Sequence, residues 1–338
     1  MTVEATTKRR RIFSGMQPSG EAHLGNFLGA LKPWVELQDH HDCIFCIVDD
    51  HAITSGSDPR ELPRRTFDLA VSYLAVGLDP ERAIIFVQSD VAEHTELAWL
   101  FNAVTPVGDL ERMTQYKDKS QQFESVPAGI LNYPILQAAD ILLYRADAVP
   151  VGEDQRQHLE LTRDIARKWN AQYGDYFPEP EGLIGKVGRI LGLDGNAKMS
   201  KSLGNTVGIL AEPDEIWGRV RTAVTDPQRV KRNDPGRPEV CNVFTLHGHL
   251  TDSERVAQIA DQCRTAEIGC VDCKRILAES ISETFEPMRE RAEHFRQRPD
   301  EVRDVLEHGA ARARAIATET IGEVREKMGL DWRSAVPV

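Results

Sequence analysis

The sequence predicts an α/β protein in which a parallel sheet is followed by a helical C-terminal region. Three short predicted strands, residues 8–13 (a basic lead-in to Ile12 and Phe13) and the apolar segments 43–48 and 83–88, alternate with two longer stretches whose apolar residues have helical spacing. This alternation is typical of parallel strands joined by right-handed crossovers. Because the spacing is helical in the last part of the chain, we place a sheet-containing domain at 1–206 and a helical domain at 207–338.

The first two predicted helices contain residues that mark where each one begins, is interrupted or ends. A helix is predicted from about residue 24 to 39, and Pro33 lies inside its pattern, where it should kink or interrupt the helix. Asp58 and Pro59 begin a second helix that runs to about residue 76, because a capping carboxylate and early prolines fit a helix N-terminus. Gly77 fits the C-terminal end of that helix.

The middle of the chain breaks the alternation. Residues 94–144 are mostly helical in pattern, which predicts a helical insertion over the sheet. A further short strand is expected at 148–151, followed by a helix at 153–169, and residues 178–188 are expected to form a loop rich in Gly and Pro. Later helices are predicted near 214–223, 253–265, 273–296 and 300–328.

The composition of the chain limits the classes of protein to which it can belong. The chain has 338 residues, of which 41% are hydrophobic and 28% charged, so it can bury a sizeable core. No apolar run approaches the roughly 18 residues of a membrane span, and the N-terminus is polar without an apolar signal core. We therefore expect a cytoplasmic protein with no membrane partner. The net charge of −12 argues against a general nucleic-acid coat protein and against DNA binding, but it leaves room for a local basic patch.

The segment Ala197–Asn205 carries two lysines and two serines in a short loop closed by a glycine. Lys198 and Lys201 are three residues apart and could both reach one pyrophosphate, while the hydroxyls of Ser200 and Ser202 supply further donors. The pattern suits a mobile clamp for polyphosphate, but taken alone it does not favour one. An exposed basic loop is the simpler interpretation of this segment alone.

A second motif lies near the start of the chain. The strand that ends at Phe13 runs into a turn rich in Gly, Pro and Ser, and His23-Leu24-Gly25-Asn26 then opens a helical pattern. This strand–turn–helix is typical of a nucleotide cradle, and Gly25 would let the backbone approach a ligand closely.

Together, His-Leu-Gly-Asn and Lys-Met-Ser-Lys-Ser resemble the two signatures of class I aminoacyl-tRNA synthetases, in order and in separation. The segment from Phe13 to Asn26 is most similar to the bacterial tryptophanyl-tRNA synthetases. The resemblance covers nearly the whole chain after about residue 8, and it is carried further by 47–49, 51–54, 111–115, 138–144 and 149–155.

The resemblance implies a Rossmann-type, doubly wound catalytic domain and a helical anticodon-binding domain, in a homodimer. It implies a ligase that joins L-tryptophan to ATP, with Mg²⁺, to form tryptophanyl-adenylate and pyrophosphate. The enzyme would then transfer tryptophan to a ribose hydroxyl of tRNA(Trp). The first step needs alignment and neutralisation of charge on the leaving pyrophosphate.

The family's residue roles carry over to matching positions. The catalytic residues so implied are His23, Asn26, Lys119, Lys198 and Lys201. The implied ATP site consists of Gln17, Ser19, Gly20, His23, Gly25, Asn26, Gly152, Glu153, Asp154, Lys198, Met199, Ser200, Lys201 and Ser202.

The implied tryptophan site consists of Phe13, Gly15, His51, Gln115, Tyr133, Gln137, Asp140 and Gln155. In the family, the carboxylate matching Asp140 accepts the indole N–H, which would separate tryptophan from phenylalanine without editing. Plainer interpretations exist: His23 as a helix N-terminal residue with a local hydrogen bond, Asp154 as a helix cap, and Asp140 as a solvated helix residue.

Two departures from the family pattern keep other functions open. Gln137 stands where the bacterial enzymes usually have Met, and Asp50 where they have Gln. Gln137 beside Asp140 also resembles the tyrosyl-tRNA synthetases, so tyrosine specificity is the nearest rival. Gly-Glu-Asp-Gln at 152–155 and Gly-Met-Gln-Pro-Ser-Gly at 15–20 match the tryptophanyl pattern instead. A non-charging nucleotide- or RNA-binding paralogue is a third hypothesis, against which the intact lysine motif argues.

The six cysteines fall into two groups. Cys43 and Cys46 lie in an apolar strand, and their odd spacing puts the two side chains on opposite faces, so we interpret them as core residues.

The other four, Cys241, Cys263, Cys270 and Cys273, predict a metal site, for which a [4Fe–4S] cluster, Zn²⁺ and free thiols all remain possible. Some tryptophanyl-tRNA synthetases carry such a cluster with similar spacing. Nearby cations could make a patch for the anticodon loop: Arg229, Lys231, Arg232, Lys274 and Arg275.

Overall fold

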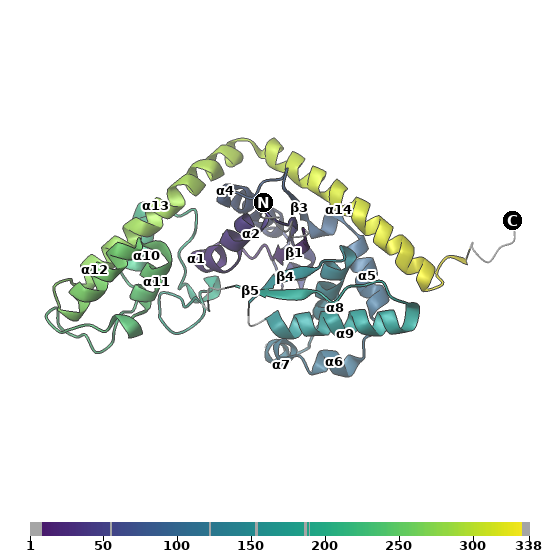
Figure 1. Ribbon diagram of the computed structural model, residues 1–338, viewed down its shortest axis with the longest axis horizontal. Helices are drawn as coiled ribbons and strands as arrows, with labels where there is room; N and C mark the ends of the chain where they lie inside the picture. Colours follow the sequence, from purple (N-terminus) through teal and green to yellow (C-terminus); the bar gives the residue numbers. More distant parts are fainter. Residues whose placement is uncertain are drawn as a thin grey trace, which may run out of the picture.

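The computed structural model describes residues 9–54, 56–121, 123–152, 155–185, 188 and 190–332. Its centre is a parallel five-stranded sheet with the order β3-β2-β1-β4-β5 (Figure 1). The chain builds outward from the central β1 to one side and then returns to build the other side. This is the doubly wound arrangement that the sequence predicts. The strands are β1 (Arg11–Met16), β2 (Asp42–Ile47), β3 (Ala83–Val87), β4 (Ala148–Val151) and β5 (Glu181–Ile184).

The edge strand β5 corrects the loop expected at 178–188. Residues 181–184 pair in parallel with β4, from Ala148 with Glu181 to Val151 with Ile184. Glycine and proline near this segment suggested a loop, but both are tolerated in edge strands. Gly182 also has a packing role, since a Cβ there would lie 2.9 Å from Leu159.

The two faces of the sheet carry separate hydrophobic clusters. Ile12, Cys43 and Phe45 belong to one cluster, whereas Phe13 and Cys46 belong to the other. The prediction that the two strand cysteines are core residues on opposite faces is therefore confirmed.

The predicted interruption at Pro33 is a single turn of π-helix. The chain forms α1 (Leu24–Asn26), then the π-turn η1 (Phe27–Leu31), then α2 (Lys32–Leu37), which has Pro33 in its first turn. Proline cannot donate a backbone hydrogen bond and clashes with the preceding turn. The wider turn, in which Lys32 N–H donates to the Phe27 carbonyl, accommodates it.

The second helix starts later than its sequence suggests. α4 (Leu62–Val76) begins four residues after Asp58, which instead binds Arg60 in a local turn. Its predicted end is confirmed, because Gly77 is left-handed with a φ of 106°.

The insertion between β3 and β4 is helical, as expected. It contains α5 (Glu93–Phe101), α6 (Val107–Glu111), α7 (Thr114–Ser120) and α8 (Ala128–Leu143). Two short elements follow strand ends: α3 (Asp49–Ile53) after β2, and the 3₁₀ turn η2 (Gln88–Asp90) after β3. The helix after β4 is α9 (Arg156–Tyr173).

The C-terminal part is helical, and its two long helices form the arms of an arch over the sheet (Figure 1). One helix that the sequence analysis did not predict is α11. No helix in the described ranges is long and apolar enough to span a membrane. The elements are η4 (Lys201–Leu203), α10 (Pro213–Val220), η5 (Pro238–Val240), α11 (Asn242–Leu250), α12 (Ser253–Arg264), α13 (Cys270–Gln297) and α14 (Pro299–Lys327).

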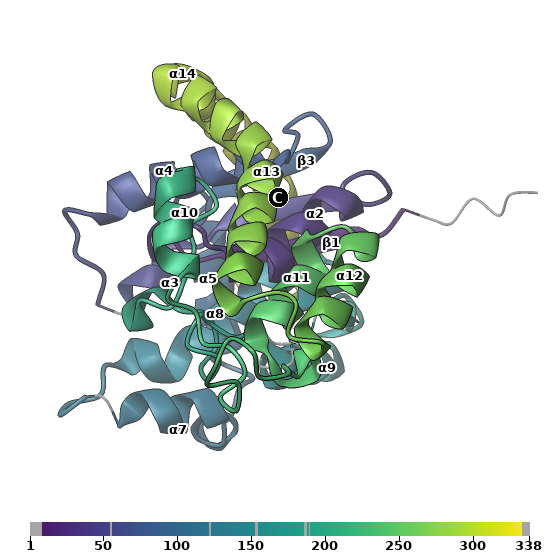
Figure 2. The ribbon, with the colours of Figure 1, turned by 90° about the vertical axis from the view of Figure 1, so that its left-hand side faces the viewer.

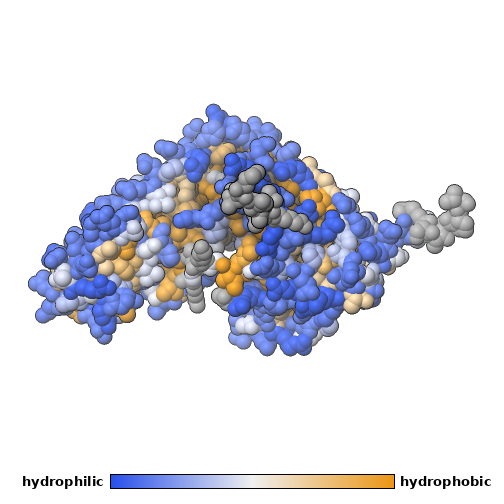
Figure 3. Space-filling view, in the orientation of Figure 1, coloured by the Kyte–Doolittle hydropathy of each residue, from blue (hydrophilic) through white to orange (hydrophobic). Residues whose placement is uncertain are grey.

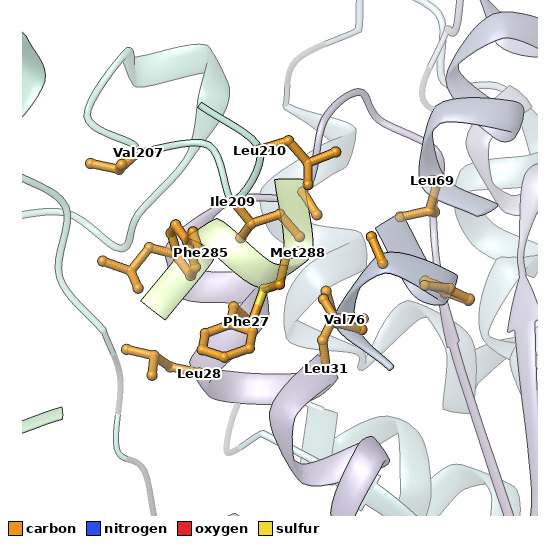
Figure 4. Packing of buried hydrophobic residues seen from close by; sticks show 14 of the residues in the cluster. Phe27, Leu28, Leu31, Leu69, Val76, Val207, Ile209, Leu210, Phe285 and Met288 are labelled. Carbon is orange, nitrogen blue, oxygen red and sulfur yellow. The ribbon is translucent and has the colours of Figure 1, made fainter. Parts of the chain in front are cut away.

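The helical part shares its core with the sheet-containing part. Figure 4 shows side chains of η1, α4, the segment after the lysine loop and α13 packed together. The rings of Phe27 and Phe285 meet edge to face with centroids 5.4 Å apart. Seen from the side, α4 and α10 lie along α13 (Figure 2). The division at residue 206 stays a prediction, but burial is continuous across it.

The last helix returns to the sheet and packs on β3. Gly309 is the closest point, because a Cβ there would overlap the carbonyl oxygen of Ile85. Arg312 fixes the register by donating to the carbonyls of Pro80 (2.7 Å) and Ala83 (3.2 Å).

Two glycines of α14 give a matched test of this contact. Gly309→Ala should lower the free energy of unfolding by about 1–3 kcal/mol through overpacking. Gly322→Ala has open space around its Cβ, and it should raise stability by about 0.5–1 kcal/mol because alanine favours helix. Chemical denaturation of both variants measures the difference. Equal effects of the same sign would contradict the close packing of α14 on β3.

Candidate active site

The two predicted nucleotide motifs meet in the structure. Gly25 lies so close to the lysine loop that an added Cβ would be 3.2 Å from the Cβ of Met199. Leu24 N–H donates to the Val207 carbonyl (2.8 Å), and His23 forms an isolated bridge with Gly208. Segments about 180 residues apart in the sequence are therefore held together by backbone hydrogen bonds.

A buried amide fixes the lysine loop. The side chain of Asn205 accepts from Ser200 N–H (2.8 Å) and donates to Asp194 (2.9 Å) and to the Lys198 carbonyl (3.3 Å). Met199 is buried in the core, and its N–H donates to the Ile190 carbonyl. The backbone of Ser202 lies in η4. The loop is thus anchored at its base rather than loosely attached.

His23 caps the helix that it opens. Asn26 N–H donates to His23 Nδ1 (3.2 Å), and His23 N–H donates to Asn26 Oδ1 (3.1 Å), which together form a capping box. Burial, and then the nearby cations Lys201 and Lys198, lower the pKa of His23 to about 4. The ring is therefore neutral at pH 7, and because Nδ1 accepts a hydrogen bond, the proton is on Nε2 and can be donated to a ligand.

Lys201 faces the turn of the first motif. Its ammonium group would be 3.2 Å from a Cβ added to Gly20, which has a φ of 121°. Burial lowers the pKa of Lys201 to about 8, while the carboxylate of Glu21 opposes this shift. In the same turn, Ser19 N–H donates to the Gln17 carbonyl (2.8 Å), and Ser19 is exposed.

The third predicted lysine lies elsewhere. Lys119 is on α7, with its ammonium nitrogen 4.4 Å from the centre of the Tyr133 ring. Burial lowers its pKa. The structure thus places Lys119 against the predicted tryptophan site. Glu153 and Asp154 lie outside the described residues, and Gly152 is exposed after β4.

Asp140 is the centre of a buried hydrogen-bond network. Its carboxylate is 2.7 Å from His51 Nε2, 2.7 Å from His94 Nδ1 and 2.6 Å from Gln88 Nε2. Burial favours the neutral acid, but the attraction and hydrogen bonds of His51 and His94 outweigh it and lower the pKa of Asp140 to about 2. The interpretation of Asp140 as a solvated residue is wrong.

The other predicted amino-acid residues lie around this centre. Tyr133 OH donates to Gln115 Oε1 (3.1 Å), and Gln137 Nε2 donates to Gln155 Oε1 (3.4 Å). The ring of His51 meets that of Tyr133 edge to face at 6.4 Å.

The two predicted residues of β1 are positioned by close packing. Phe13 is buried and stacks on Tyr144, with ring centroids 5.5 Å apart. A Cβ on Gly15 would lie 2.8 Å from Val48, so glycine allows β1 to pass close to the end of β2.

Four polar residues of this site were missed in the sequence: Gln88, His94, Tyr144 and His158. His158 Nε2 is 2.9 Å from Tyr133 OH, and His94 Nε2 is 2.7 Å from Tyr144 OH. Gln88 directly follows β3, as Asp49 and His51 follow β2, so its strand-end position was a usable signal. His94 and His158 lie inside helices, and no pattern in the neighbouring sequence identifies them as site residues.

The four late cysteines come together. Burial first, and then the thiols of Cys241, Cys263 and Cys270, raise the pKa of Cys273 to about 12, so all three lie within electrostatic reach of it. His247 is 3.5 Å from the sulfur of Cys273. In the part of the chain that the structure describes, no three His, Cys, Asp or Glu side chains are arranged to hold a single metal ion.

Two open grooves lie away from both motifs. One, of about 540 Å³, runs between α2 and the α11–α13 helices, and the other, of about 570 Å³, lies between η2–α5 and α14. Figure 3 shows hydrophobic side chains gathered in the hollow between the two sides of the arch. No residue of the two nucleotide motifs lines either groove.

The chain belongs to the class I tRNA synthetases for tryptophan and tyrosine, whose family model (tRNA synthetases class I (W and Y)) matches residues 5–286. Among similar proteins, the tryptophan–tRNA ligase of Deinococcus radiodurans is 53% identical over 324 residues, which cover 94% of this chain and 98% of that protein. The tryptophan–tRNA ligase of Thermotoga maritima is 44% identical, with 95% and 99% covered.

Comparison with solved structures supports the same family. Tryptophanyl-tRNA synthetase from Campylobacter jejuni, complexed with ADP and tryptophan, superposes with a TM-score of 0.86 at 36% identity, covering 94% of this chain and 99% of that one. Tyrosyl-tRNA synthetase from Archaeoglobus fulgidus has a TM-score of 0.67 at 21% identity, which shows the fold alone.

The charge on Lys201 predicts a pH dependence. Its ammonium form prevails below about pH 8 and is lost as the pH rises through that value, so affinity for ATP should weaken on the alkaline side. Glu21→Gln removes the carboxylate that supports the charge, and it should move this loss of affinity to lower pH. Titration of ATP at constant ionic strength across pH 6.5–9.5 would measure the shift.

Glu286→Gln is the matched control, since this exposed glutamate lies on α13. It should leave the pH midpoint unchanged. The same midpoint in wild type and Glu21→Gln would refute the electrostatic link between Glu21 and Lys201.

Proposed function

We propose that this chain is a tryptophan–tRNA ligase, which activates L-tryptophan with ATP and transfers it to tRNA(Trp). The observation that carries the proposal is the meeting of the two signature motifs at Gly25 and Met199, together with the buried hydrogen-bond network around Asp140. Relatives of nearly equal length that are named tryptophan–tRNA ligase support the choice of amino acid.

In the first step, the tryptophan carboxylate attacks the α-phosphorus of ATP and pyrophosphate leaves. Lys198 and Lys201 would neutralise the charge that develops on the leaving group. His23 is neutral and would donate from Nε2 to a phosphate oxygen, without adding a third cation to the site. Mg²⁺ would accompany ATP, mainly on phosphate oxygens.

Amino-acid choice would rest on Asp140. A buried, ionised carboxylate that is left without a donor costs free energy, so a ligand that lacks the indole N–H is rejected. Tyr133, Gln115 and Gln155 would complete the pocket. Tyrosine specificity has less support, because the similar proteins named tryptophan–tRNA ligase are 53% and 44% identical to this chain, whereas the tyrosyl-tRNA synthetase shows a likeness of fold alone.

The intact lysines argue against a non-charging paralogue. Lys198 and Lys201 stand on a loop anchored by Asn205, so both cations that adenylate formation would use are present.

We also propose that the chain forms a homodimer. Support comes from exposed apolar residues in the helical insertion, since Trp99 on α5 is 76% exposed and Val107 on α6 is 58% exposed. Aromatic side chains such as Trp are enriched at protein–protein interfaces.

The four-cysteine site fits a [4Fe–4S] cluster better than a single zinc ion. The thiols lie near one another on three segments: Cys241 before α11, Cys263 on α12, and Cys270 and Cys273 at the start of α13. Among the described residues, no three such side chains are arranged to hold a single metal ion, so the proposal rests on the proximity of the four thiols and on the spacing of the cysteines in the sequence. When bound, the cluster would cross-link these segments.

The clamp can be tested by Lys201→Ala. Loss of this ammonium should lower the rate of ATP–pyrophosphate exchange on the order of 100-fold, as for removal of one transition-state donor, while the Kd for tryptophan changes little. Lys32→Ala, an exposed lysine on α2, is the control and should exchange at the wild-type rate. An unchanged exchange rate in Lys201→Ala would rule out its assigned role.

The cluster can be tested by purification without oxygen. We expect broad visible absorption and about four iron atoms and four sulfides per chain. Cys270→Ser should lose most of the iron, whereas Cys46→Ser, in the core of β2, should keep it. A colourless protein with bound zinc, or with no metal, would refute the iron–sulfur assignment.

A further inference from the structure

The hydrogen bonds to Asp140 are unevenly divided between its two oxygens. Oδ1 is 2.6 Å from Gln88 Nε2 and 2.7 Å from His94 Nδ1, while Oδ2 is 2.7 Å from His51 Nε2. An ionised carboxylate has about two acceptor positions on each oxygen. Counting the bonds between described residues, Oδ1 is therefore full and Oδ2 has one position left.

We propose that Gln88 and His94 are positioning residues that set amino-acid specificity: by occupying Oδ1 of Asp140, they leave Oδ2 as the acceptor for the indole N–H. This inference rests on the proposed function, in which Asp140 selects tryptophan. Neither residue needs to touch the substrate. Both residues act by holding the carboxylate group of Asp140 in one orientation.

His94 receives its orientation from Tyr144. The Tyr144 hydroxyl is 2.7 Å from His94 Nε2, and burial raises the pKa of this phenol well above its usual range, so it keeps its proton. When the hydroxyl donates to Nε2, the His94 N–H that remains is on Nδ1 and points at Asp140. Stacking of Tyr144 on Phe13, with an interplanar angle of 11°, fixes the start of this chain of bonds.

Gln88 is held in place by its neighbours in η2. Ser89 donates to Asp49 from both its N–H (3.0 Å) and its hydroxyl (2.6 Å), and Arg314 of α14 donates to the Asp90 carbonyl. The three residues of η2 are thus tied to three different helices. Gln88 is fully buried, and its Oε1 has no hydrogen-bond partner among the described residues. The Gln88 amide therefore makes its one side-chain hydrogen bond among the described residues to Asp140.

The test compares tryptophan with β-(benzothiophen-3-yl)alanine, in which sulfur replaces the indole N–H. The measured quantity is the ratio of kcat/KM for the two amino acids in ATP–pyrophosphate exchange by the full-length protein. Gln88→Met and His94→Leu should each reduce this ratio at least about tenfold, mainly through KM for tryptophan, because a free carboxylate can turn away from the indole. His94→Asn, whose amide can stand in for Nδ1, should restore part of the ratio.

Gln38→Met is the matched control. Gln38 is also a buried glutamine, but it lies at the end of α2, where it bonds the Gly77 carbonyl and Asp79 N–H (both 2.9 Å). This variant should lose thermal stability without a change in the ratio. If Gln88→Met or His94→Leu does not fold, Tyr144→Phe keeps the ring and its packing while removing the donor to His94, and it should lower the ratio in the same direction.

The outcomes separate the inference from the function. If the wild-type protein does not activate tryptophan, the proposed function is wrong. If the wild type rejects the sulfur analogue and Asp140→Asn abolishes that rejection, while the Gln88, His94 and Tyr144 variants keep it, the function stands and the inference is overturned.

Discussion

The contact on which the site depends is the close approach of Gly25 to Met199. It requires a glycine on one side and a buried methionine on the other. Met199 belongs to the same hydrophobic cluster as the strands and α13, so the lysine loop is part of the core at its base. Burial of one apolar side chain therefore positions the charged residues on either side of it, and chemistry at the surface depends on packing beneath.

The second constraint is electrostatic. His23, Lys198 and Lys201 are close enough for the two lysines to help lower the pKa of the histidine. The carboxylate of Glu21 supports the charge of Lys201 against the effect of burial. Because His23 is neutral, it keeps an N–H donor beside the lysines without adding a further positive charge.

Most features that local interactions form could be predicted from the sequence, whereas hydrogen bonds between residues far apart in the sequence could not. The strands, the proline interruption and the glycine at the end of α4 have local causes, and the sequence showed them. β5 was hidden because an edge strand can contain the residues of a loop, and Asp58 because a turn can use the same carboxylate as a helix cap. Both motifs were recognised by resemblance. Gln88 and His94 were not, since their bonds to Asp140 span 52 and 46 residues.

Those long-range bonds determine the charge state of Asp140. Asp140 is buried, and burial alone would favour its neutral form, which would itself donate a proton and no longer demand a donor from the ligand. Hydrogen bonds from His51, His94 and Gln88 keep the carboxylate charged. The more of its acceptor positions the protein fills, the fewer orientations a ligand can use. If Asp140 accepts the ligand N–H as we propose, specificity would depend on the donors that the protein supplies to this carboxylate as well as on the carboxylate itself.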